Sequence, residues 1–165
     1  MQTLTDLDNK NWFFYLSDPQ KLLFQTVAKL LAQAKNSDQL LADYSYLIFP
    51  AAKAYEGFLK NFLLDLNLVS ERACYDKHFR IGRSLNPDVR QNQRDEFWLY
   101  DDVSRKCGKE VARLLWEAWL KCRNQVFHYF PDKPQLLNLE TAISRLKLLE
   151  EAMEAAVNCL KQSNL

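Results

Sequence analysis

Residues 103–131 read VSRKCGKEVARLLWEAWLKCRNQVFHYFP. Apolar residues recur there every three or four positions, the spacing of one face of an α-helix. This stripe consists of Val103, Cys107, Val111, Leu115, Ala118, Cys122 and Val126. The spacing predicts a helix over about 101–128. The prolines Pro131 and Pro134 predict its end, since the residue before a proline avoids helical backbone.

A second apolar set lies roughly 100° around the same helix, at about 100° per residue. It consists of Ala112, Trp116, Trp119 and Phe127, and Arg123 falls in its middle. Two apolar faces indicate that the helix is central, or that its second face meets another subunit. An arginine among tryptophans favours a subunit interface or a pocket over plain solvent.

The rest of the chain carries further helical signals. Periodic apolar residues predict helices near 19–35, 38–67 and 135–161. An aromatic run at 12–16 predicts a short helix or cap on the bundle. The low counts, Gly 3 and Pro 5, leave little turn chemistry for many short strands. We therefore expect one all-α domain over 1–165, an up-and-down bundle of four to five helices.

Two residues are unusual within the predicted 38–67 helix. Pro50 removes a backbone donor and clashes with the preceding turn, so either the helix kinks there or one helix ends near residue 49 and another begins. Gly57 costs about 1 kcal/mol relative to alanine in a helix. Close approach of another backbone is the usual reason for such a glycine.

Residues 68–101 lose the helical period and form an irregular excursion between the second and third long helices. We expect a short helix within it, since a structureless loop of this length is uncommon in a compact domain. Its stretch 72–94 carries a local charge of +4 inside a chain of net charge +1. Cations interleaved with aromatic residues suit single-stranded nucleic acid; the alternative is a solvated excursion with incidental charge. The cations are Arg72, Lys77, Arg80, Arg83, Arg90 and Arg94.

Composition also bears on location. No run approaches the roughly 20 apolar residues needed to span a bilayer, and the first residues lack the basic start of a secretion signal. The four cysteines form no C-x-x-C pair, which favours reduced and mostly buried thiols. We therefore expect a cytoplasmic protein.

The end of the 101–128 helix carries a concentration of reactive side chains. Arginine is a fixed positive charge whose planar fork suits a phosphate, and histidine can transfer a proton near neutral pH. Asn124 and His128 stand four apart, as neighbours on a helix face do. On an ideal helix Arg123 and His128 would point about 140° apart, so they converge only if the helix ends or distorts. The alternative is a last turn whose cations are favoured by the helix dipole.

The sequence Arg123-Asn124-Gln125-Val126-Phe127-His128 resembles the R-N-x-x-x-H motif of HEPN domains, which are all-helical and include many metal-independent RNases acting as homodimers. The stretch 52–60 also resembles the helix that supplies a catalytic acid in RNase LS-type toxins. That likeness makes Glu56 a candidate site residue; without it, Glu56 between Lys53 and Lys60 indicates a solvated ion-pair face.

The resemblance implies RNA cleavage without metal or cofactor, in a toxin or an antiphage protein with a possible antitoxin or regulatory partner. His128 would transfer the proton, Arg123 would hold the phosphate oxygens, Asn124 would orient either, and Glu56 would position Arg123 or transfer a second proton. Trp116 and Trp119 would lie near the contact of two subunits. The predicted RNA-binding residues are Lys53, Lys60, Lys77, His78, Arg80, Arg83 and Arg90.

Other chemistries fit the sequence less well. The only histidines, His78 and His128, match no zinc spacing, and the three glycines stand too far apart for a phosphate loop. Cys122 is badly aligned with His128 for cysteine nucleophile chemistry. Two alternatives to the RNase stay open: a non-catalytic HEPN-like module that binds RNA, nucleotide or a partner, and a structural helical adaptor.

Overall fold

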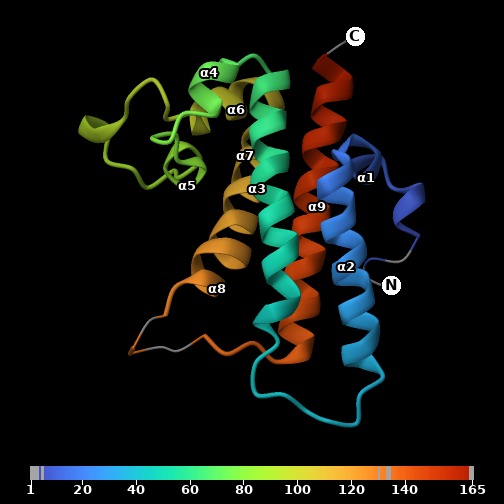
Figure 1. Cartoon of the computed structure of the whole chain (residues 1–165). Helices are drawn as coiled ribbons and strands as arrows, with labels where there is room; N and C mark the ends of the chain where they lie inside the picture. The colour runs from blue at the N-terminus through green and yellow to red at the C-terminus, as the bar shows by residue number, and fades with distance from the viewer. Residues whose placement is uncertain (1–3, 5, 130, 133–134, 164–165) are drawn as a thin grey trace.

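The computed structural model describes residues 4, 6–129, 131–132 and 135–163, which form helices and irregular segments with no β-strand among them. Figure 1 shows α2, α3, the α6–α8 run and α9 lying side by side along one direction, each antiparallel to the one before. The predicted all-α, up-and-down bundle is therefore confirmed. The helix α3 lies between α2 and α9 and also contacts the excursion.

The first elements cover one side of the bundle. After the short turn η1 (Leu7–Asn9), helix α1 (Asn11–Tyr15) buries Trp12 and Phe13 against the core, as the aromatic run predicts. Helix α2 (Asp18–Lys35) begins where the sequence predicts it. There the backbone N–H of Ser17 donates to the side chain of Gln20, which satisfies one free donor of the helix start.

Helix α3 (Ile48–Asp65) supplies the centre of the core. Its aromatic residues Tyr55, Phe58 and Phe62 are fully buried, and the stacked rings of Phe58 and Phe62 lie 6.2 Å apart. Burying each such side chain stabilises the fold by roughly 1.5–3 kcal/mol. Gly57 is the position where α2 comes close: a Cβ there would lie 2.5 Å from Nε2 of Gln20. The close neighbour is therefore a side chain, not the backbone that the sequence suggested.

The prediction of helix over 38–47 is wrong. This segment is irregular up to the turn η2 (Ser45–Leu47), because its polar groups bond outside any helix. The N–H of Tyr44 donates to the carbonyl of Leu137 over 2.8 Å. Helix α3 then begins at Ile48, so Pro50 lies in its first turn, where no intrahelical donor is missing. One helix begins near Pro50 and no kink is needed.

Asp43 ties this segment to the chain ahead of α9. Its Oδ1 accepts hydrogen bonds from the N–H of Leu137 (2.9 Å) and from the N–H and hydroxyl of Ser45 (3.1 and 2.7 Å). Burial raises the pKa of Asp43, but these hydrogen bonds outweigh it and hold the pKa below its ordinary value. The stabilisation is complete above the pKa of the unfolded carboxyl and is lost as pH falls through the lowered pKa.

We expect Asp43→Asn to lower the free energy of unfolding by about 1–2 kcal/mol at pH 7, since it weakens hydrogen bonds to a charged acceptor. The loss should shrink as the pH is lowered from 7 to 3, because the wild-type carboxyl comes closer to its lowered pKa. Urea unfolding at both pH values measures this, with the exposed Asp38→Asn as control. An equal loss at pH 7 and pH 3 would contradict the role of the charge.

The excursion follows α3 and contains α4 (Glu71–Cys74), α5 (Ile81–Ser84) and the turn η3 (Gln91–Gln93), so the expected short helix is present. Two of its cations hold it together. Arg94 donates through Nε to the carbonyl of Val89 and stacks 3.8 Å over the Trp98 ring. Arg83 pairs with Asp95 at 2.8 Å. These two charges therefore serve the internal structure of the excursion.

The predicted 101–128 helix is divided. Helix α6 (Tyr100–Cys107) ends at Gly108, whose φ of 92° is readily adopted by glycine, and α7 (Lys109–Trp119) follows. The next residues, 120–124, form a π-helix, η4 (Leu120–Asn124), before the short α8 (Gln125–Phe127). The helical run therefore ends at Phe127, close to the end that the prolines predict, and the π-helix distorts it before that end. Pro134 and Phe130 lie outside the described residues.

Helix α9 (Leu139–Ser163) closes the bundle, beginning a few residues after the predicted start. The prediction of four reduced cysteines is wrong, because a disulfide joins Cys107 to Cys159 with their Cα atoms 5.4 Å apart. Cys74 and Cys122 are free and buried, as expected. Among the described residues, no helix is both long enough and apolar enough to cross a bilayer.

Candidate functional site

Arg123 is held on an aromatic face at the end of α7. Trp119, Arg123 and Phe127 follow one another at intervals of four residues, and the guanidinium carbon lies 5.5 Å from the centroid of the Trp119 ring and 5.1 Å from that of Phe127. Both distances are within the range of cation–π attraction. The arginine predicted to mark an interface or a pocket is therefore fixed between two rings, with its side chain 32 % exposed.

The π turn that carries Arg123 is supported from α9. Arg145 donates to the carbonyl of Lys121 and, over 3.4 Å, to the side chain of Gln125. Such π turns frequently mark functional sites. The neighbouring Cys122 is fully buried, and burial raises the pKa of its thiol to about 12. A thiol held in its neutral form is a poor nucleophile, which agrees with excluding cysteine chemistry.

Glu56 approaches Arg123 from α3. Its Oε2 lies 3.9 Å from Nε of Arg123, and its side chain is 41 % exposed. The structure thus brings together the two residues that the resemblance pairs, from positions 67 apart in the chain. At that distance the contact is an ion pair without a hydrogen bond, so the carboxylate oxygens keep capacity to accept other donors.

Two hollows meet at this ion pair, and Glu56 and Arg123 line both. The first, called here the cationic hollow, has a volume of about 230 Å³ and is open between the end of α7 and the excursion. Arg80 is exposed and forms no ion pair with a described residue, whereas Arg83 is paired with Asp95. The lining residues are Glu56, Phe79, Arg80, Ile81, Gly82, Arg83, Trp119, Arg123 and Asn124.

Gly82 allows the excursion to lie directly on Trp119. A Cβ at this position would stand 2.6 Å from Nε1 and 3.2 Å from Cε2 of the indole, so only glycine fits here. The Nε1 donor is buried and has no partner among the described residues. Trp119 is 5 % exposed, because its own chain covers it. Trp116 is half-buried. A subunit contact near Trp116 and Trp119 stays a prediction.

The second hollow, called here the aromatic hollow, lies on the other side of Arg123 and has a volume of about 430 Å³. Phe49 and Phe127 are each 43 % exposed and pack edge to face, with ring centroids 4.8 Å apart. Three of its lining residues are charged. The lining residues are Leu23, Phe49, Pro50, Ala52, Lys53, Glu56, Arg123 and Phe127.

His128 lies just beyond both hollows. It is the first residue after α8, it has extended backbone (φ −109°, ψ 135°), and it is exposed. Among the described residues that line the two hollows, Asn124 is present in the cationic one and His128 in neither. The structure therefore assembles Glu56, Arg123 and Asn124 and places the histidine at the edge of this group.

The remaining predicted RNA-binding residues are more scattered. Lys60 stands one turn beyond Glu56, with Nζ 6.0 Å from the centroid of the Tyr75 ring. Lys77, His78 and Arg90 are exposed on the excursion and line neither hollow. Their contact with RNA stays a prediction. The sequence analysis missed two site residues, Phe49 and Gly82. The only feature of the sequence that could have indicated Phe49 is that an aromatic residue stands beside Pro50.

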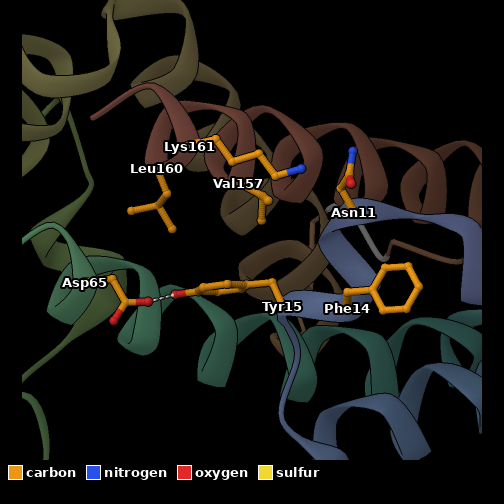
Figure 2. Close-up of a pocket in the computed structure, with 7 residues that line it drawn as sticks. All are labelled: Asn11, Phe14, Tyr15, Asp65, Val157, Leu160 and Lys161. Carbon is orange, nitrogen blue, oxygen red and sulfur yellow. Dashed lines mark hydrogen bonds between the residues drawn. The ribbon is translucent and has the colours of Figure 1, made fainter. Parts of the chain in front are cut away.

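A further hollow lies at the other end of the bundle (Figure 2), where Tyr15 donates to Asp65 over 2.5 Å. Burial, followed by the hydrogen bond to that carboxylate, raises the pKa of Tyr15 above its ordinary value. The close-up shows Phe14 and Lys161 around the same opening, and its lining includes no residue of the motif. Among the described residues, no three His, Cys, Asp or Glu side chains gather closely enough to hold a metal ion.

Comparison of the chain with models of protein families, with curated proteins and with solved structures found no match.

Proposed function

We propose that this protein is a metal-independent endoribonuclease of HEPN type, acting as a homodimer with its site at the subunit interface, in a toxin or defence role. The observation that carries the proposal is the position of Arg123. It stands at the junction of a cationic and an aromatic hollow, with Glu56 beside it and Asn124 next in the chain. A strand of RNA presents both phosphates and bases to such a junction.

The reaction needs only the groups of the RNA and of this chain. The ribose 2′-oxygen forms a bond to the adjacent phosphorus, and the bond from phosphorus to the 5′-oxygen of the next nucleotide breaks. One proton leaves the 2′-hydroxyl and one reaches the departing 5′-oxygen, so the products are a 2′,3′-cyclic phosphate and a free 5′-hydroxyl. Arg123 would stabilise the charge that grows on the phosphate oxygens, and His128 would transfer one of the two protons.

Incubation of the purified protein with a mixed RNA pool in EDTA tests the proposal. We expect cleavage with cyclic phosphate ends, no cleavage of strands with 2′-deoxy residues, and a loss of at least about 100-fold in Arg123→Ala. Arg113→Ala is the matched control, because Arg113 lies on α7 and pairs only with Glu110 and Glu117 among the described residues. Equal cleavage by Arg123→Ala and wild type would overturn the proposal.

A second candidate is a binding module without catalysis. The exposed position of His128 outside the two hollows favours it, since the binding groups are assembled without the proton donor. RNA that binds to the wild-type protein in EDTA but stays intact, with affinity lost in Arg123→Ala, would support this alternative.

A further inference from the structure

The aromatic hollow has a lining that differs from that of the cationic hollow. Its walls come from α2, α3, η4 and α8 and are mostly apolar, and the charged residues among them are Lys53, Glu56 and Arg123. Its volume of about 430 Å³ is within the range of small-molecule sites, roughly 300–1,000 Å³. It is thus suited to a flat, mostly apolar group with polar edges.

The two phenylalanines form a preorganised wall. Phe127 is held by the Phe49 ring at 4.8 Å and by the guanidinium of Arg123 at 5.1 Å, yet 43 % of its surface stays exposed. An exposed ring held in this way offers an aromatic face or edge at little cost in side-chain entropy. Nucleobases stack on such rings, and each stacked base contributes substantially to binding.

Glu56 adds a polar group with a definite preference. Its carboxylate forms no hydrogen bond with a described residue, and its ion pair with Arg123 spans 3.9 Å. An ionised carboxylate only accepts hydrogen bonds. Guanine presents two adjacent donors, N1–H and N2–H, on one edge, whereas uracil presents a single N–H between two carbonyl oxygens that a carboxylate repels.

The shared lining of the two hollows orients a nucleotide. Arg123 and Glu56 line both, whereas Arg80 lines only the cationic hollow and the two phenylalanines line only the aromatic one. A nucleotide across the junction would therefore place its phosphate near the arginines and its base against Phe127.

We infer that the aromatic hollow is a nucleobase subsite that prefers guanine, with Phe49 and Phe127 stacking the base and Glu56 reading its edge. This inference rests on the proposed function in taking RNA as the ligand. It assigns Glu56 a specificity role, separate from the positioning of Arg123.

Calorimetric titration of the protein in EDTA with the four nucleoside 5′-monophosphates and with ribose 5-phosphate tests the inference. We expect GMP to bind most tightly, UMP about tenfold more weakly, and ribose 5-phosphate more weakly still. Phe127→Ala should weaken GMP binding by roughly tenfold or more and leave ribose 5-phosphate unchanged. If thermal unfolding shows that Phe127→Ala does not fold, Phe49→Ala takes its place in this measurement.

Two further variants separate the parts of the subsite. Glu56→Gln should bring the GMP and UMP affinities together while stacking persists. Phe14→Ala, which removes an exposed ring from the hollow of Figure 2, should bind GMP as wild type does.

The inference is overturned if ribose 5-phosphate binds as tightly as GMP, or if Phe127→Ala and Phe49→Ala bind GMP normally. It is also overturned if Phe127→Ala turns a dimer into a monomer without changing nucleotide affinity, since a second copy of the chain would then occupy the hollow. Selective GMP binding without RNA cleavage would keep the subsite and reject the nuclease. Cleavage of RNA by the wild-type protein without GMP binding would support the nuclease and reject the subsite.

Discussion

Replacing His128 with alanine should slow RNA cleavage by roughly 10²–10⁴-fold, the usual contribution of a positioned general acid or base. The position of His128 lets this variant test the chemical step separately from the stability of the fold. The side chain is exposed at the first residue beyond α8, so its removal opens no cavity in the core. Changes at exposed positions usually alter the free energy of unfolding by less than about 0.5 kcal/mol, and the variant should unfold at the wild-type temperature.

His128 lines neither hollow, so we expect RNA affinity to persist in the variant. Removing a residue that transfers a proton lowers the rate of the chemical step, whereas removing a residue that only binds RNA lowers the affinity for RNA. Single-turnover cleavage with saturating protein separates the two. Tyr129→Ala, which removes the neighbouring exposed ring, is the control. If His128→Ala cleaves RNA at the wild-type rate, the proton must come from elsewhere and the catalytic reading of the motif fails.

The parts of the fold that the sequence predicted are those set by local periodicity. Helix α2 begins near its predicted start because its apolar residues repeat at helical spacing. The capping contact between Ser17 and Gln20 and the proline in the first turn are local as well. The irregular course of 38–47 depends instead on partners near Leu137, about 90 residues away. The break at Gly108 was missed because the apolar stripe continues across it in the same register.

The site shows the same division. Arg123 and Asn124 are neighbours in the sequence, and the motif identified them. Glu56 was found through a resemblance, and only the packing of α3 against the end of α7 shows that it lies beside Arg123. Gly82 and Phe49 carry no motif. Gly82 lies against Trp119 and Phe49 packs on Phe127, and these contacts between distant residues cannot be predicted from spacing in the sequence.

The disulfide between Cys107 and Cys159 should be the strongest single stabilising link in the chain. It closes a loop with a sequence separation of 52. In the chain-entropy account, a loop of that size corresponds to about 4 kcal/mol of stabilisation through the unfolded state. Reduction should therefore lower the free energy of unfolding by up to about 4 kcal/mol and shift the urea midpoint accordingly.

The double variant Cys107→Ser, Cys159→Ser is the control for this measurement, because it keeps the buried thiols Cys74 and Cys122. A reductant should destabilise the wild type and leave the double variant unchanged; equal responses would show that the link does not stabilise the fold. Helix α6, which ends at Cys107, lies at the opposite end of the bundle from α8 (Figure 1). RNA binding and cleavage should therefore survive reduction at low temperature. Disulfides are rare in the cytosol. The cysteines therefore no longer support the cytoplasmic location that the sequence analysis predicts.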